Sequence, residues 1–473
     1  MTTSATVSLA PQEFAKSKAT REKMLWGVLL LVTVICVVLH QGRVLTYIFP
    51  VMIFGMALVL QKESPRAYVR LLIITLVFTP FVRRLADWAS VYTDPSPLLV
   101  APLLAPFASL RSIRYRGLLG KKELPFVLAG MGILYGLMIG LISNHISSSM
   151  FVSFLRWSNP LVWGLYLVQK HEDRTDLGTT LVNTLRWTTL VCAIYGLVQV
   201  AFTPPWDLLW LKGQLENGTT ASFGVDTSPF GFRLFATLNS CGVAAPILGI
   251  GAIAWLGSKS KLRFPALAIV IAALFLTMVR TEWLCLPASV MLMVMLSGKH
   301  RGPIVRAIVA AGCVLIVAGS TIGAAQPEMM GKLTDRVSGM SRGARDESYS
   351  SRATAMSQAL GMLKDLPFGA GLGFLDSPEY DATPMSFSSG AAGGDLALVG
   401  MFFDLGYLGA LAYLLGVGMV LVAMLRHKAR DTATAAMLTT IAVSTILHFW
   451  SNIPFVAPEA FFFWASAAIA EGL

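Results

Sequence analysis

The sequence predicts an all-α polytopic integral membrane protein with about 12–14 transmembrane helices and a large, partly helical periplasmic loop. Of its 473 residues, 55% are hydrophobic and only 13% are charged. A soluble globular domain carries about 25% charged residues. The mean hydropathy of +0.66 and repeated apolar runs, each about 20 residues long and able to cross a bilayer, support the same class. An ordinary soluble fold is therefore excluded.

Basic residues recur in every second gap between the apolar runs. Twenty-three of the 37 Lys and Arg residues follow this pattern, and the intervening short gaps hold only Arg43, Arg83, Arg84 and Arg280. Because Lys and Arg beside membrane segments stay on the cytoplasmic side, the pattern predicts that both termini are cytoplasmic. Topology also accounts for the net charge of +11, so this charge does not indicate nucleic-acid binding.

The apolar runs and the gaps between them predict the domain organisation. We expect about fourteen spans, one of them centred near residue 103. Both long gaps face the periplasm in the predicted orientation. The expected segments are a cytoplasmic tail (1–23), N-terminal transmembrane helices (24–203), a periplasmic loop (204–235), central transmembrane helices (236–324), a large periplasmic loop (325–395) and C-terminal transmembrane helices (396–473).

The large loop contains a predicted amphipathic helix over residues 350–366. Its apolar residues recur at helical spacing, and Ser350 or Ser351 is suited to cap its start. Pro367 ends the helix, and the following PFGAGLG turn allows its backbone to approach a neighbour or a ligand closely. The turn follows a helix and lacks the Lys-Ser/Thr of a P-loop, so it does not predict nucleotide binding.

Arginines are frequent on the predicted outer side. The planar guanidinium group matches phosphate oxygens in a bidentate way, which makes these residues candidate phosphate ligands. The alternative is that they pair with nearby acids such as Glu282 or extend toward lipid headgroups. The outer arginines outside the short N-terminal gaps are Arg233, Arg280, Arg336, Arg342, Arg345 and Arg352.

The remaining ionisable residues give weaker signals. Arg186 lies within a predicted span, and we expect it, or its counterpart Arg156, to pair with Asp404 or Glu459 or to line a pyrophosphate path. His448 ends a span and is expected at the membrane interface. No metal-binding pattern and no cofactor motif occurs, so the sequence predicts neither a bound metal nor a cofactor.

Four segments, in this order, resemble the O-antigen ligase and Wzy-type polysaccharide polymerase superfamily. They are RLFATLNSCG (233–242), VRTEW (279–283), Arg352 followed by ALGMLKDLPFGAGLG, and DLALVGMFFDLGYLGALAYL (395–414). Val279 stands where the family usually has Ser. Asp395-Leu396 stands where ligases commonly have His-Asn, which favours a polymerase because polymerases vary at this position.

The resemblance implies a GT-C-like architecture and a multi-pass location in the bacterial inner membrane. It implies a polymerase that joins undecaprenyl-pyrophosphate-linked repeat units on the periplasmic face and releases undecaprenyl pyrophosphate. Arg233, Arg280 and Arg352 would stabilise the departing pyrophosphate in place of a metal, and Asp395 would be the catalytic base, followed by Glu282 and then Glu459. Further predicted substrate-binding residues are Arg336, Arg342 and Arg345.

The same resemblance leaves alternatives open. A ligase or an O-oligosaccharyltransferase would use the same chemistry with lipid A core or protein as the acceptor. A non-catalytic transporter of lipid-linked glycans is a third possibility, although the sequence lacks the repeated halves that are typical of transporters. The implied partners are the lipid-linked oligosaccharide, the bilayer, and a chain-length regulator and flippase of the same pathway.

Overall fold

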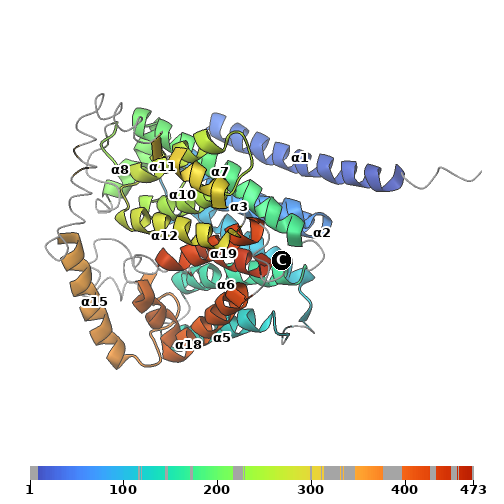
Figure 1. Cartoon of the computed structure of the whole chain (residues 1–473). Helices are drawn as coiled ribbons and strands as arrows, with labels where there is room; N and C mark the ends of the chain where they lie inside the picture. Colours follow the sequence, from blue (N-terminus) through green and yellow to red (C-terminus); the bar gives the residue numbers. More distant parts are fainter. Residues whose placement is uncertain are drawn as a thin grey trace, which may run out of the picture.

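The structure, a computed structural model, contains helices and no strand within the residues that it describes (Figure 1). These residues are 9–115, 118, 120–143, 147–170, 174–216, 227, 229–298, 301–310, 312–313, 331, 334, 347–376, 397–426, 433–448, 455 and 458–470. The all-α expectation is confirmed. The main helices are α1 (Leu9–Val38), α2 (Gly42–Glu63), α3 (Pro65–Trp88), α5 (Leu124–Ser143), α6 (Ser148–Val168), α7 (Arg174–Phe202), α8 (Pro205–Glu216), α10 (Cys241–Leu256), α11 (Arg263–Leu276), α12 (Arg280–Leu296), α15 (Glu347–Asp365), α18 (Ala397–Arg426), α19 (Ala433–Leu447) and α20 (Pro458–Ala470).

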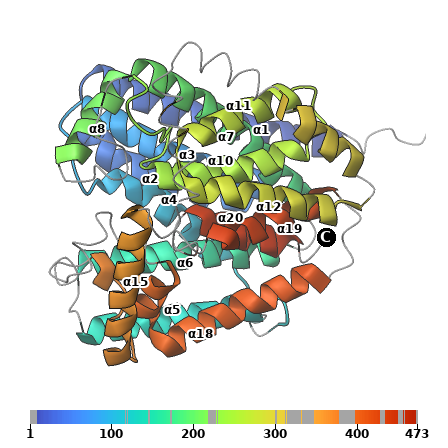
Figure 2. The same cartoon turned by 60° about the vertical axis from the view of Figure 1, so that its left-hand side comes forward.

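The helices form one bundle around α19 and α20. On one side of this central pair, α10 and α12 pack against α19, and on the other side α6 packs against α20 (Figure 2). Helices α5 and α18 form the most extensive pair, and α2, α3 and α7 form another group with α1 at its edge. Every residue of α20 from Glu459 to Ala470 is buried. A helix that is apolar all round belongs inside a bundle, as α20 does.

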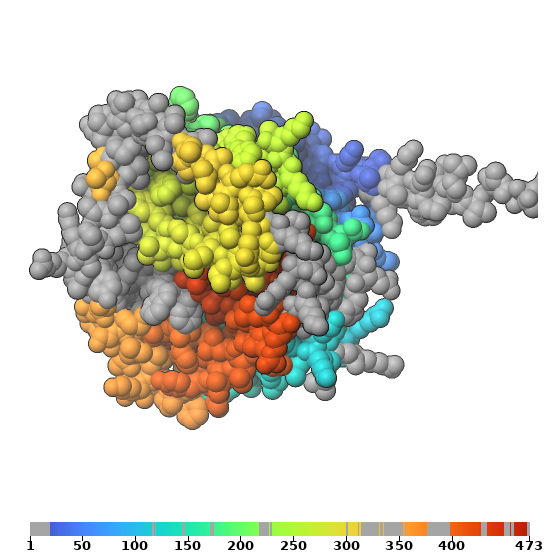
Figure 3. All heavy atoms as spheres, in the orientation of Figure 1, coloured from blue at the N-terminus to red at the C-terminus, as the bar shows by residue number. Residues whose placement is uncertain are grey.

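Length and apolar composition identify the protein as an integral membrane protein. Among the described residues, four helices are long and apolar enough to cross a bilayer, namely those at 42–63, 124–143, 175–202 and 398–426. Large apolar side chains point outward along the bundle, including Val51 (71% exposed) and Ile142 (75% exposed). Such exposure is unfavourable in water and expected against lipid. In the space-filling view, the yellow surface of the α12 region borders the red-orange surface of the C-terminal helices (Figure 3).

The span predicted near residue 103 is a broken helix. It consists of η1 (Pro97–Val100), α4 (Ala101–Leu104) and η2 (Ala105–Ser112). Pro102 and Pro106 interrupt the regular hydrogen bonding because proline has no N–H to donate. The Tyr68 hydroxyl donates to the carbonyl oxygens of Ala105 and Pro106, at 3.0 and 3.1 Å, and so satisfies part of the interrupted backbone.

The glycine-rich turn after α15 approaches neighbouring backbone closely. Gly369, Gly371 and Gly373 have φ values of +84°, +93° and +88°, a region that favours glycine. A Cβ at Gly371 would lie 2.3 Å from the Gly140 nitrogen in α5. The Ala370 amide donates to the Phe403 carbonyl at 2.8 Å. The turn therefore joins the end of α15 to both α5 and α18.

Helix α15 covers residues 347–365, where the sequence predicted a helix over 350–366. Its Ala359 and Leu363 are buried against Val399 and Phe403 of α18. Two links therefore hold α15 on the bundle: this apolar contact and the glycine-rich turn. Figure 2 shows α15 crossing in front of α5 and α18.

We expect the substitution Gly371→Ala to destabilise the protein by about 1–3 kcal/mol, the usual cost of a strained backbone conformation. The added Cβ would meet the backbone of Gly140 in addition to the unfavourable φ. Thermal unfolding of the purified protein in detergent would measure the change. Gly361→Ala within α15 is the matched control, because nothing lies within 4 Å of its Cβ position. Equal stability of the two variants would contradict the prediction.

Candidate functional site

Several helices meet at one end of the bundle, called here the Arg280 end. Helices α3, α7 and α11 end there, and α10 and α12 begin there. The Leu234 amide donates to the Leu276 carbonyl at 3.0 Å, which attaches the loop carrying Arg233 to the end of α11. Arg280 follows four residues later as the first residue of α12. Two of the arginines predicted to bind phosphate therefore lie on segments that are joined directly.

Arg233 and Arg280 are both half-buried. The Arg233 guanidinium lies within hydrogen-bonding reach of the Cys241 thiol at the start of α10. Arg280 begins α12, whose N-cap residue Val279 provides no side-chain cap. The first amides of a helix and its dipole favour an anion. The local arrangement of Arg280 therefore suits an anionic group.

An unusual backbone conformation shapes the loop that carries Arg233. Ala236 has a φ of +51°, which is rare for a residue with a side chain. Its amide donates to Gln199 Oε1 at 2.8 Å, and its carbonyl accepts from Gln199 Nε2 at 3.1 Å and from Arg84 Nη2. Such conformations persist only where the surrounding structure determines them. Helices α3 and α7 thus determine the path of this loop.

The Arg84 side chain is fully buried and joins three segments. Its Nε lies 2.9 Å from Asp207 Oδ1 of α8, and its Nη1 donates to the Leu238 carbonyl at 2.8 Å. The aromatic rings of Phe81, Trp210 and Phe235 surround the guanidinium, with centroids 5.0 to 5.8 Å from Cζ. A buried charge is stable only when it is paired and hydrogen-bonded. Arg84 therefore fixes α8 and the 236–238 loop to α3.

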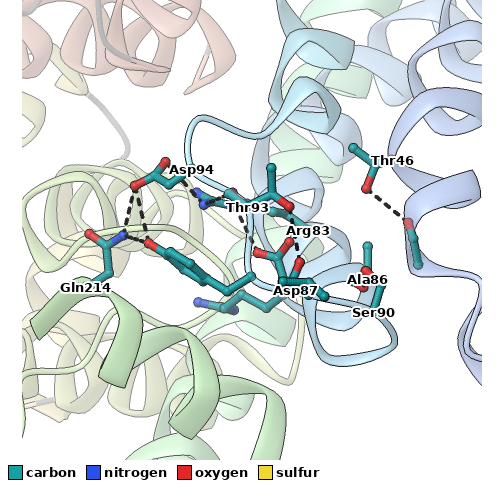
Figure 4. Close-up of polar contacts among 12 residues, drawn as sticks. Thr46, Arg83, Ala86, Asp87, Ser90, Thr93, Asp94 and Gln214 are labelled. Carbon is teal, nitrogen blue, oxygen red and sulfur yellow. Dashed lines mark hydrogen bonds and ion pairs between the residues drawn. The ribbon is translucent and has the colours of Figure 1, made fainter. Parts of the chain in front are cut away.

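The adjacent Arg83 anchors a second polar cluster at the same end (Figure 4). It binds Asp87 Oδ2 at 3.3 Å, the Thr93 carbonyl at 2.7 Å and Asp94 Oδ1 at 3.3 Å. Gln214 of α8 donates to the Tyr92 hydroxyl at 2.6 Å. Burial, followed by the nearby Asp94 charge, raises the pKa of the Tyr92 phenol. The hydroxyl therefore stays protonated at neutral pH and donates to Asp94 Oδ2.

A buried acid–base pair connects α12 with the end of α19. Glu282 Oε2 is bonded to His448 Nε2, and both side chains are almost fully buried. Glu282 Oε1 has no hydrogen-bond partner among the described residues. Glu459 at the start of α20 lies close enough to act electrostatically on both side chains. Both of its carboxylate oxygens lack partners within the described part of the chain.

The absence of a side chain at Gly249 makes room for this pair. A Cβ at Gly249 in α10 would lie 1.8 Å from Glu282 Oε1. The carboxylate therefore occupies the space beside the α10 backbone. The pair depends on packing between α10, α12 and α19 as well as on its own hydrogen bond.

Arg186 is one of the charges within the predicted spans, and its hydrogen bonds differ from the ion pair considered for it. Arg186 donates to the Ala254 carbonyl at 2.8 Å and to Asn183 Oδ1 at 2.9 Å, and it pairs with neither Asp404 nor Glu459. The Trp157 indole donates to Asp404 Oδ2 at 2.9 Å. Arg186 therefore does not form the ion pair considered for it, and the pairing considered for Arg156 stays a prediction. One backbone carbonyl and one asparagine side chain accept hydrogen bonds from Arg186, and a tryptophan donates to Asp404.

The structure brings part of the predicted site together. Arg233, Arg280 and Glu282 lie at the Arg280 end. Asp395, Arg336, Arg342 and Arg345 lie outside the described residues, as does the side chain of Arg352, whose backbone belongs to α15. His448 was expected at the membrane interface, but the structure buries it against Glu282. Its position in HFWSN at the end of a span gave no signal for a partner 166 residues away.

These features define an all-α polytopic membrane protein in which Arg233, Arg280 and the Glu282–His448 pair lie at one end of the bundle. Residues 265–414, about a third of the chain, match the family model described as O-antigen ligase. The predicted resemblance is confirmed. The match supports a role in glycan transfer of the ligase or polymerase type. No curated protein and no solved structure matches the chain.

The substitution Gly249→Ala tests the Glu282–His448 pair without removing either partner. The added methyl would overlap Glu282 Oε1, so we expect the pair to separate and glycan transfer to fall as far as in Glu282→Gln. Glycan products in a complemented deletion strain would measure this. Gly242→Ala on the same helix is the control, because only Ser240 Oγ approaches its Cβ position, at 3.9 Å. Normal transfer in Gly249→Ala would contradict the prediction.

The buried ion pair of Arg84 should contribute more to stability than an exposed pair of the same type. We expect Asp207→Ala to lower the free energy of unfolding by about 3–5 kcal/mol, because it leaves Arg84 buried without its counter-charge. Asp176→Ala, which removes the exposed partner of Arg66, should cost at most about 1 kcal/mol. The free energy of unfolding of both variants, measured in detergent, tests this prediction. Similar decreases in the two variants would refute the structural role of Arg84.

Proposed function

We propose that the protein is a polysaccharide polymerase that joins oligosaccharide repeat units carried on undecaprenyl pyrophosphate. An acceptor-sugar hydroxyl attacks the anomeric carbon of the donor glycan. The bond from that carbon to the pyrophosphate oxygen breaks, and undecaprenyl pyrophosphate leaves with both bonding electrons. The match to the O-antigen ligase family at residues 265–414 is the observation that carries this proposal. The site then lies on the periplasmic face of a bacterial inner membrane, with both termini cytoplasmic.

The arginines at the Arg280 end support this chemistry. Negative charge grows on the pyrophosphate as the glycosidic bond breaks, so fixed cations in a water-poor site stabilise the transition state more than the ground state. Arg233 and Arg280 are half-buried on segments joined by the Leu234–Leu276 hydrogen bond. We propose that both hold the pyrophosphate, with Arg352 as a third ligand and without a metal ion. We propose that Arg336, Arg342 and Arg345 of the large loop contact the rest of the substrate.

The acceptor hydroxyl requires a base, and we propose Asp395 as the first candidate. Glu282 is the second candidate, and its contact with His448 adds a group that can orient the carboxylate or share the proton. Glu459, close to both, is the third. General-base assistance typically contributes about 10²- to 10⁴-fold, so loss of the base should leave residual activity.

One observation keeps a ligase or an O-oligosaccharyltransferase as the second candidate function. The family model is described as O-antigen ligase, and a ligase differs from a polymerase only in its acceptor. Asp395-Leu396, in place of the His-Asn common in ligases, favours the polymerase. A non-catalytic transporter has no such support.

In the polymerase pathway, a flippase would supply the substrate and a chain-length regulator would act on the product.

The lipid-linked product that accumulates in a deletion strain distinguishes these functions. Loss of a polymerase should leave single repeat units on the carrier or as single-unit caps at the surface. Loss of a ligase should leave full-length polymer on undecaprenyl pyrophosphate, and loss of a flippase should trap single units on the cytoplasmic side. Full-length polymer on the carrier would reject the polymerase in favour of the ligase.

We expect Arg233→Ala, Arg280→Ala and Arg352→Ala each to lower transfer by about 10²- to 10³-fold, the usual effect of removing one group that stabilises a developing anion. Polymer should disappear while the amount of protein in the membrane stays normal. Arg43→Ala is the control, because Arg43 is an exposed arginine at the start of α2, outside the proposed site. Normal polymer in the three variants would remove these residues from the site.

A further inference from the structure

A groove between α3 and α7 opens at the other end of the bundle, where both helices begin. Its volume is about 330 Å³. Arg70 and Ile74 of α3 line it together with Thr180, Asn183, Thr184 and Trp187 of α7. With Thr188, which also lines it, the groove combines a guanidinium, an amide and three hydroxyls on the surface of the bundle. No step of the proposed glycan transfer uses these residues.

Two polar groups of the groove, the Arg70 guanidinium and the Asn183 amide, have unused hydrogen-bond donors. Arg70 binds Glu22 of α1 through Nε at 2.8 Å and through Nη2, which leaves Nη1 without a partner among the described residues. Asn183 accepts from Arg186 through Oδ1 at 2.9 Å, and within the described chain its amide nitrogen donates to no other residue. Because both groups are hydrogen-bond donors, a ligand that matches them provides acceptor oxygens.

An apolar stripe continues from the groove along α7. Trp187, Val191, Ile194 and Val198 are 52%, 49%, 45% and 42% exposed. Their spacing of four, three and four residues places them on one face of the helix. At 1.5 Å per residue, the stripe extends about 16 Å, which is close to half the roughly 30 Å hydrocarbon core of a bilayer. A polar groove at the start of a lipid-facing stripe fits one headgroup with its acyl chain.

The charge at this end favours an anionic headgroup. Three arginines form ion pairs here: Arg21 with Glu63, Arg66 with Asp176, and Arg70 with Glu22. Lys23 and Lys62 are also exposed here and have no ion pair within the described residues. The surplus of positive charge attracts the phosphate of an acidic lipid.

We infer that the α3–α7 groove binds an anionic glycerophospholipid. Its phosphate lies against Arg70 Nη1 and the Asn183 amide, and one acyl chain follows the Trp187–Val198 stripe. The bound lipid fills the polar groove and extends the contact between α1, α3 and α7. This site is distinct from the Arg280 end and does not depend on the proposed glycan transfer.

Native mass spectrometry of the purified full-length protein tests the site, with phosphatidylglycerol and phosphatidylcholine as separate probes. The wild type should retain one phosphatidylglycerol and release phosphatidylcholine. Arg70→Gln and Asn183→Leu should each lower phosphatidylglycerol retention by about tenfold, the effect of losing one charge-assisted contact. Thr179→Val, an exposed neighbour outside the groove, should retain the lipid as the wild type does.

The variant Glu22→Gln separates lipid binding from helix packing. It removes the same α1–α3 ion pair as Arg70→Gln but keeps the guanidinium, so retention should equal or exceed that of the wild type. Equal losses in Glu22→Gln and Arg70→Gln would show that only α1 packing matters and would overturn the proposal. Equal retention of both probes would also overturn it. Preferential retention of undecaprenyl phosphate over phosphatidylglycerol at equal concentration would assign the groove to another lipid class.

Discussion

The buried pair between Arg84 and Asp207 is the interaction on which the Arg280 end depends. Neither side chain is exposed, and the same guanidinium binds two carbonyls of the 236–238 loop. In a low-dielectric interior a charge of this kind has few acceptable positions, because each alternative leaves it unpaired. The pair therefore selects one arrangement of α3, α8 and the loop. That arrangement positions the loop that carries Arg233. Helix α3 contributes to it even though α3 lies outside residues 265–414, the region that matches the ligase family.

Arginines at this end divide into two groups by burial. Arg83 and Arg84 are almost fully buried, and carboxylates and carbonyls of the chain itself surround their guanidinium groups. Arg233 and Arg280 are only half-buried and lie on the loop and helix start that the first group positions. Buried arginines thus provide rigidity, and half-buried ones provide a positive surface at the Arg280 end. The same residue type serves both purposes because its charge persists in either environment.

Local patterns in the sequence were sufficient to predict much of the fold. Apolar runs, the basic alternation and the PFGAGLG turn indicated a helical membrane protein and a close backbone approach, since each is encoded within about 20 neighbouring residues. The prolines that break the span near residue 103 are also local, but hydropathy does not register the backbone N–H groups that they lack. Contacts between distant residues were not predictable. The hydrogen-bond acceptors of Arg84 lie more than 120 residues away in the sequence. Glu282, which bonds to His448, lies 166 residues away from it. No spacing rule connects such positions.

The first turn of α12 carries one basic and one acidic residue, and their side chains lie in different surroundings. Arg280 and Glu282 are two residues apart, so their side chains leave the helix on nearly opposite sides and do not face each other. Glu282 turns inward to His448 beside Gly249, while Arg280 stays half-buried at the helix start. If the residues were four apart, the carboxylate would sit beside the guanidinium and weaken its attraction for an anion. This spacing keeps a cation and the carboxylate of a buried acid–base pair within one helical turn, the combination on which the proposed transfer relies.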